Sequence, residues 1–230
     1  MKTTDLGIFL HRTSYSESSL IVWFYTKRNG LQKYMYRGGK KKAHSLFPMA
    51  ITELTYYART DDKLINLTNV EGLSPLRFQF DPAKTTIAFF MAEAIRKCVH
   101  IGDSDETLFL FIEQQIEKLN NSNELSLFPL RFLIDSSKMF GFMPLSEPNG
   151  ASVFNIEEGV FQHKPNPLER THEGEGVNLI LTILKGEEVG VTTEKMREQA
   201  LQIMMDYYSI HVPTLDELES YNIVREVLRS

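Results

Sequence analysis

The sequence predicts an α+β protein, in which a five-stranded β-barrel of the OB type is followed by a mostly helical domain with a small β-hairpin. Residues 1–80 carry apolar residues with the two-residue period of strands, whereas residues 81–230 follow the 3.6-residue period of helices. Charge changes at the same place. The first part has 12 Lys/Arg and 6 Asp/Glu, net +6, and the second has 13 and 24, net −11, which together give −5. We therefore expect two domains, 1–80 and 81–230.

The first 80 residues contain five strand-like stretches, which is the number of strands in an OB-type barrel. They are rich in β-branched and aromatic residues and are expected at Leu6–Leu10, Ser19–Thr26, Leu31–Arg37, Met49–Arg59 and Lys63–Val70, the last after a turn at Asp61-Asp62. Asn29-Gly30 predicts a type I′ hairpin turn between the second and third.

In the third strand, Tyr34 and Tyr36 point opposite to Lys33 and Arg37, because side chains alternate along a strand. The two tyrosines either fill the barrel core or stack on bases, and the sequence leaves both open.

Helical signals begin at Asp81-Pro82, an N-cap residue followed by proline at the first helical position. Helices are expected over 86–100, 103–119, 125–140, 177–185, 192–210 and 214–229. Between them, residues 153–163 resemble a hairpin with its turn at Glu158-Gly159. Residues 164–175 are rich in Pro, Gly and charge, and are expected to form an exposed, mobile linker.

The strongest functional signal is the basic segment 27–42, in which seven of sixteen residues are Lys or Arg and none is acidic. One interpretation is a solvated face. The other is a nucleic-acid surface, which the interleaved aromatics and the acidic remainder of the chain favour. Lys33 and Arg37 share a strand face suited to following a phosphate backbone. Lys40–Lys42 would form a mobile cationic tip, and Arg12 would extend the same face.

Several classes of function find no support in the sequence. No apolar run approaches the ~20 residues that span a bilayer, and we expect no signal peptide and a cytoplasmic location. The single cysteine, Cys98, on the apolar side of its helix, and six scattered histidines predict no metal site. Neither a phosphate-binding G-x-x-x-x-G-K-[ST] loop nor a G-x-S-x-G elbow is present, and no carboxylate cluster indicates a nuclease. We expect no catalytic residue and no cofactor.

Another functional signal is the segment 128–133, in which Arg131 stands among bulky apolar residues that include Phe128 and Phe132. It is either a core helix with an arginine reaching into water or a groove for an apolar peptide that ends in a carboxylate.

Several motifs together resemble the bacterial RecO family. They are Gly7–Val22, which contains Tyr15-Ser16-Glu17-Ser18, then Asn29-Gly30-Leu31 with Arg37–Lys42, Phe132–Pro144, and Val153-Phe154-Asn155 with Gly159-Val160-Phe161. The resemblance runs in order over nearly the whole chain and is most specific at its start. Many members carry a four-cysteine zinc site after the Gly-Phe motif. This chain has Ser146–Gly150 there without a cysteine, so the following hairpin must hold without zinc.

The resemblance implies a recombination mediator that binds single- and double-stranded DNA and anneals complementary strands without ATP. With RecR, such proteins help to load RecA onto strands coated by single-strand-binding protein, whose C-terminal tail they bind on the helical domain. It implies a DNA face at Arg12, Arg37, Lys40, Lys41 and Lys42, to which strand geometry adds Lys27, Arg28 and Lys33. It places Arg131, between Phe128 and Phe132, beside the tail groove. Two alternatives stay open: a protein–protein adaptor with an incidental basic segment, and a metal-dependent nuclease.

Overall fold

The structure is a computed structural model that describes residues 2–57, 64–73, 76, 78, 80–146, 150–213, 215 and 218–227, with the backbone alone at 44 and 45. It forms two compact units, 1–122 and 123–230, and each is described by itself. The compact units therefore do not divide at residue 80, because the first two helices group with the barrel. The functional division near residue 80 stays a prediction.

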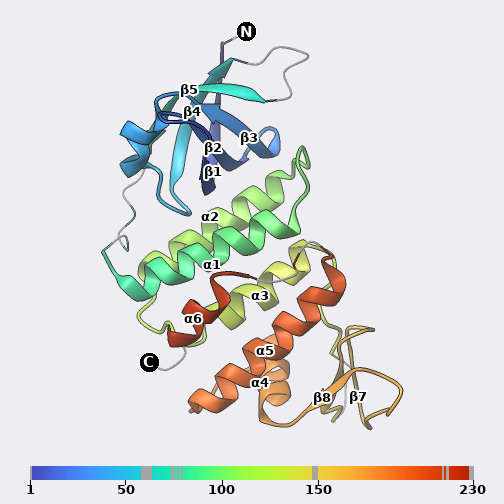
Figure 1. Cartoon of the computed structure of the whole chain (residues 1–230). Helices are drawn as coiled ribbons and strands as arrows, with labels where there is room; N and C mark the ends of the chain where they lie inside the picture. Colours follow the sequence, from blue (N-terminus) through green and yellow to red (C-terminus); the bar gives the residue numbers. More distant parts are fainter. Residues whose placement is uncertain are drawn as a thin grey trace. The chain divides into compact units, whose positions relative to one another are not determined.

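The N-terminal unit contains the predicted five-stranded barrel, drawn in blue to cyan in Figure 1. The barrel closes in the strand order β1-β2-β3-β5-β4, with β3 and β5 parallel and every other pair antiparallel. Closure leaves no free sheet edge, and this order is that of an OB-type barrel. The strands are β1 Lys2–Ser14, β2 Leu20–Thr26, β3 Gly30–Tyr36, β4 Ile51–Tyr57 and β5 Ile65–Gly72. The turn predicted at Asp61-Asp62 lies outside the described residues.

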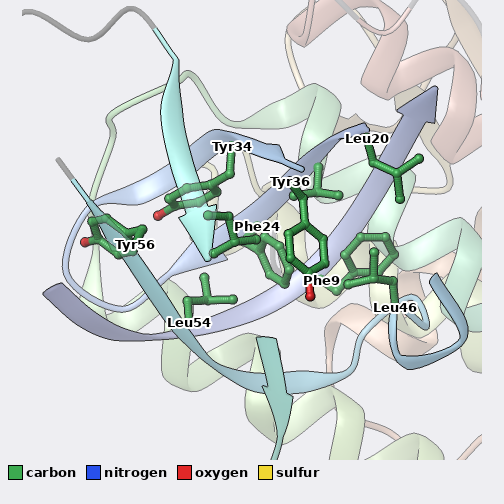
Figure 2. Close-up of a cluster of buried hydrophobic side chains, with 10 residues drawn as sticks. Phe9, Leu20, Phe24, Tyr34, Tyr36, Leu46, Leu54 and Tyr56 are labelled. Atoms are coloured by element: carbon green, nitrogen blue, oxygen red, sulfur yellow. The ribbon is translucent and has the colours of Figure 1, made fainter. Parts of the chain in front are cut away.

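Aromatic side chains from four strands fill the barrel (Figure 2). Tyr34 and Tyr36 point inward and are 0% and 1% exposed, so they are core residues and do not stack on bases. Tyr34 packs against Phe24, with ring centroids 6.1 Å apart, and Phe24 packs against Phe9 at 5.4 Å. Burial raises the pKa of both tyrosines. The alternation of β3 thus turns its lysine and its following arginine to the outside of the barrel.

The hairpin between β2 and β3 differs from the predicted type I′ turn. Thr26 pairs with Gly30, so three residues, Lys27 to Asn29, form the loop, and only Gly30 has a positive φ, of 63°. The Thr26 hydroxyl accepts from the Asn29 amide and donates to the Gly30 carbonyl. A Cβ on Gly30 would lie 1.7 Å from the carbonyl oxygen of Asp103, so this position requires glycine for both conformation and space.

The predicted mobile tip at Lys40–Lys42 is wrong, because these lysines lie in a 3₁₀ helix, η1, Gly39–Ser45. Gly38, with φ 68°, turns the chain into the helix, and the Lys40 amide donates to the Ser18 carbonyl. Leu46, which follows η1, is buried in the barrel core. The lysines are therefore held on a short ordered element at one end of the barrel.

Two helices complete the N-terminal unit: α1, Pro82–Cys98, and α2, Glu106–Asn121. The predicted N-cap at Asp81 is confirmed, since its carboxylate accepts from two amides of the first turn, and the Asp105 carboxylate caps α2 by accepting from the Thr107 amide. Burial raises the pKa of the Cys98 thiol to about 12, as expected for a structural cysteine.

The C-terminal unit packs helices with a three-stranded sheet of order β7-β6-β8. The predicted hairpin is confirmed as β6 and β7, with Gly159 at φ 68° in its turn. The elements are α3 Phe128–Met139, β6 Val153–Asn155, β7 Val160–Gln162, β8 Thr171–Glu173, α4 Glu175–Leu184, α5 Glu194–His211 and α6 Tyr221–Val227.

The predicted exposure of residues 164–175 is confirmed, because none of them is buried, but the segment is not a linker, since it contains β8, which pairs with β6. One carboxylate ties this stretch to the sheet. Glu169 accepts from the side-chain amides of Asn155, Gln162 and Asn166 at 2.9, 3.1 and 2.7 Å. Hydrogen bonds to a charged acceptor are stronger than neutral ones, so this amide clamp holds the small sheet together.

Candidate nucleic-acid interface

Four of the predicted cations meet at one end of the barrel. Arg12, near the end of β1, donates from Nη1 to the Ala43 carbonyl at 2.6 Å, and so lies against η1, which carries Lys40, Lys41 and Lys42. All four are exposed. The Lys42 ammonium lies 5.7 Å from the centre of the Tyr36 ring. We call this group the η1 cluster; it joins residues that are far apart in the sequence.

Lys33 and Arg37 are also exposed and point to the outside of the barrel, Lys33 from the middle of β3 and Arg37 from just beyond its η1 end. Arg37 follows the last residue of β3 and precedes the glycines that open η1. Arg12 pairs with the inward Val22, whereas Lys33 pairs with the outward Trp23, so these two cations leave opposite faces of the sheet. The six exposed cations, namely Lys33, Arg37 and the η1 cluster, are the candidate surface for a polyanion.

Lys27 and Arg28 lie at the opposite end of β3, in the hairpin loop, and the structure does not bring them together with the other six. Seven strand residues separate the two ends, a distance of about 20 Å. The Lys27 ammonium is 3.0 Å from the Glu106 carboxylate in the first turn of α2. Burial raises the pKa of Asp5, and the positive charge of Arg28 partly offsets that rise. Both cations thus neighbour carboxylates of the same unit.

Two aromatic residues beside Lys33 were not among the predicted site residues. Trp23 on β2 lies directly opposite Lys33, and the lysine ammonium is 5.4 Å from the centre of the indole. The His11 ring, on β1, is 5.2 Å from the same indole. The sequence contains a signal for the outward position of Trp23, because this residue lies between the inward Val22 and Phe24 on the same strand.

The three residues predicted to line a peptide groove lie on α3 in the C-terminal unit. Phe128 and Phe132 are 8% and 1% exposed, whereas Arg131 is exposed. The burial of the two phenylalanines favours the first interpretation, a core helix that presents one arginine to water. A bound peptide could therefore contact the Arg131 guanidinium but little of the Phe128 and Phe132 rings.

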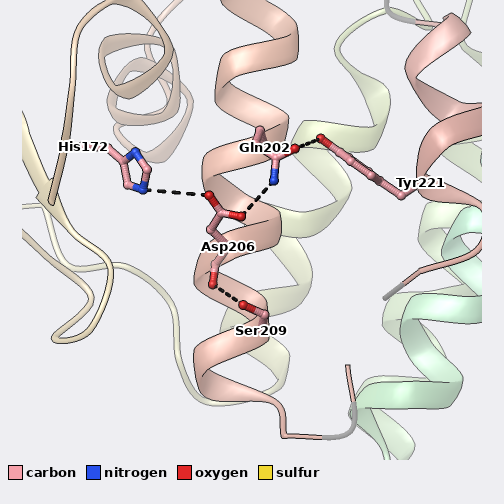
Figure 3. Close-up of polar contacts among 5 residues, drawn as sticks. All are labelled: His172, Gln202, Asp206, Ser209 and Tyr221. Atoms are coloured by element: carbon pink, nitrogen blue, oxygen red, sulfur yellow. Dashed lines mark hydrogen bonds and ion pairs between the residues drawn. The ribbon is translucent and has the colours of Figure 1, made fainter. Parts of the chain in front are cut away.

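A chain of polar contacts crosses the C-terminal unit from β8 to α6 (Figure 3). His172 lies 3.9 Å from the Asp206 carboxylate, and the Gln202 side-chain amide donates to the same carboxylate at 2.8 Å. The Tyr221 hydroxyl donates to the side-chain oxygen of Gln202 at 2.6 Å. A pocket of about 300 Å³ adjoins this chain and is lined on its apolar side by Met205, Leu215 and Leu218. Each of these polar side chains has a protein partner, so the series of contacts connects β8, α5 and α6.

The residues present do not fit the four-cysteine zinc site of many RecO-like proteins, because Cys98 is the only cysteine. Within the described ranges, no group of three or more His, Cys, Asp or Glu residues is placed to hold a metal ion. No helix in the described part of the chain is long and apolar enough to cross a membrane.

Comparison with known proteins agrees with this architecture. Residues 1–76 match the family model for the recombination protein O N-terminal domain, and residues 79–217 match that for its C-terminal domain. Three similar proteins, each named DNA repair protein RecO, come from Flavobacterium psychrophilum, Christiangramia forsetii and Phocaeicola vulgatus. They are 25%, 26% and 27% identical and are aligned over 99%, 96% and 99% of this chain and 99%, 97% and 99% of their own lengths. Because the two family models cover most of the sequence, the chain belongs to the RecO family of DNA repair and recombination proteins.

Proposed function

We propose that this protein binds single- and double-stranded DNA on the barrel and anneals complementary strands without ATP. The observation that supports this most is the surface formed by Lys33, Arg37 and the η1 cluster, which gathers six exposed cations on a chain of net charge −5. A cationic surface displaces the counterions condensed on nucleic acid, and that release drives binding without regard to sequence.

Annealing on such a surface needs no catalytic residue. Two complementary strands repel each other through their phosphates, and cations that contact both strands lower this repulsion. Binding also raises the local concentration of the strands, so that their own base pairing drives the reaction. The protein acts as a mediator and not as an enzyme, with no cofactor and in the cytoplasm.

The partners that we propose follow those of RecO-like proteins. RecR would act with this chain in loading RecA onto strands coated by single-strand-binding protein. The acidic C-terminal tail of the latter would bind the helical domain, with its carboxylates at Arg131. The exposure of Arg131 supports this placement, and the burial of Phe128 and Phe132 limits the contact that the two rings can make.

The test is an ATP-free annealing assay with complementary strands pre-coated by the cognate single-strand-binding protein. We expect the wild-type protein to accelerate annealing, and the variant Lys40→Glu/Lys41→Glu/Lys42→Glu to lose most of this activity. Unaltered annealing by that variant would favour an adaptor that acts through its helical domain alone. Cleavage of labelled strands in Mg²⁺ or Mn²⁺ would instead indicate a nuclease.

A further inference from the structure

The outer face of β1, β2 and β3 is divided into a covered and an open part. At the hairpin end, Tyr25 stacks on Phe109 of α2, with ring centroids 6.4 Å apart, and its hydroxyl donates to the Asp105 carbonyl. Leu31, opposite Tyr25, is buried beside the start of the α1–α2 connection. Two residues further along each strand, Trp23 is partly exposed and Lys33 is exposed. The helices therefore cover the face only up to this point.

The first open positions form one row across three strands. His11 pairs with Trp23, and Trp23 pairs with Lys33, so that the indole stands between an imidazole and an ammonium group. A β-bulge lies between Phe9 and His11. In a regular ladder the buried Leu10, which follows Phe9, would stand opposite Trp23. The bulge thus re-aims β1 and places a polar ring beside the indole, as bulges do near binding sites.

We infer that the indole of Trp23 is the stacking surface for one unpaired base of a bound single strand, with Lys33 as its exchangeable partner. An indole offers a broad π-face, and bases of every kind stack on aromatic rings. The Lys33 ammonium sits over this ring on a flexible stem, and an exposed contact of this kind is weak. A base displaces it, and the released ammonium then reaches a phosphate of the same strand.

This assignment predicts that the site distinguishes single strands from duplex. Bases in a duplex stack on one another and present no free face, whereas a single strand can turn one base onto the indole. The η1 cluster, by contrast, binds phosphates of either form. The inference rests on the proposed function, and it adds a preference for single strands with little preference among bases.

Trp23 is the only tryptophan in the chain, so its fluorescence reports on this site alone. The experiment titrates the full-length protein with an unlabelled oligothymidylate and follows indole emission. A parallel titration with a labelled oligothymidylate follows anisotropy, which reports binding anywhere on the protein. We expect emission to be quenched with the same midpoint as the anisotropy change, and a duplex of the same length to give an anisotropy change with little quenching.

Variants provide a second readout. Trp23→Ala should weaken single-strand binding about 10-fold and duplex binding less than about 2-fold, since aromatic stacking contributes on that scale. Trp23→Phe should restore most of the loss because it keeps a ring. The matched control is Tyr57→Ala, which removes an exposed aromatic ring from β4, and it should leave both affinities unchanged.

The outcomes separate this inference from the proposed function. Binding by anisotropy with unchanged emission, together with a Trp23→Ala loss below about 2-fold, would refute the stacking site and leave the DNA-binding proposal intact. A Trp23→Ala loss that is equal for single strands and duplex would also refute it. Failure of any DNA to change the anisotropy would refute both.

Discussion

Neutralising the lysines of η1 should change the salt dependence of DNA binding by a predictable amount. The variant is Lys40→Gln/Lys41→Gln/Lys42→Gln, which keeps the length of the segment and removes three of the six cations on the candidate surface. Each phosphate contact on a single strand contributes about −0.7 to the slope of log affinity against log salt. If all six cations contact phosphates, the wild-type slope is about −4, and that of the variant is about −2.

These slopes predict affinities that are easily separated. Between 50 and 200 mM salt, the wild-type protein should lose about 250-fold in affinity and the variant about 16-fold. The assay is fluorescence anisotropy of a labelled oligothymidylate at four or more salt concentrations. Thermal unfolding of both proteins, measured in the same buffers, checks that the substitutions leave the barrel folded.

The control is Lys27→Gln, which removes one lysine from the same basic segment. Because Lys27 lies at the other end of β3 and pairs with Glu106, its loss should change the slope by less than about 0.3, below one phosphate contact. An unchanged slope in the triple variant would contradict the assignment of η1 to the DNA surface. A slope made shallower by about 0.7 in Lys27→Gln would show that the pairing with Glu106 does not withhold this lysine from DNA.

Three further predictions concern the fold that carries the site. Gly30→Ala should lower the free energy of unfolding by about 3 kcal/mol or more, because the new Cβ meets a backbone oxygen. Gly38→Ala, also at positive φ but in open space, should lower it by only about 1 kcal/mol, and urea unfolding of both variants tests the difference. Glu169→Ala should destabilise the small sheet by about 2 kcal/mol, since the amides of Asn155 and Asn166 lose their acceptor and that of Gln162 keeps only the Lys164 carbonyl, and hydrogen exchange should show β8 opening. The exposed Glu173→Ala is the control, and equal effects of the two substitutions would contradict the clamp. Cys98, with its pKa raised to about 12, should stay protonated at pH 8.5, where a free thiol is about half ionised, so iodoacetamide should label it only after unfolding; rapid labelling of the native protein would show that the thiol is accessible.

Local patterns in the sequence were enough to predict most of the architecture. The alternation around Tyr34 and Tyr36 is a property of any strand, and it correctly separated core residues from outward cations. The N-cap at Asp81 and the turn at Gly159 follow from the conformations of single residues. Such features need no knowledge of distant parts of the chain.

Errors arose where a segment takes its structure from a distant partner. Residues 164–175 have the composition of a linker, but Glu169 gathers three amides and β8 completes the sheet on β6. Lys40–Lys42 follow two glycines and suggested a mobile tip, yet the buried Leu46 and the Ser18 carbonyl hold η1 against the barrel.

The sequence by itself determined that a basic, aromatic-rich barrel precedes acidic helices, because strand period, cap residues and charge are written in neighbouring residues. Only the tertiary structure decided which cations share a surface. It brings Arg12 to η1, joins Trp23 to His11 through a bulge, and turns Lys27 toward Glu106. Charges interact through space and not along the chain, so membership of the site depends on contacts that no local pattern specifies.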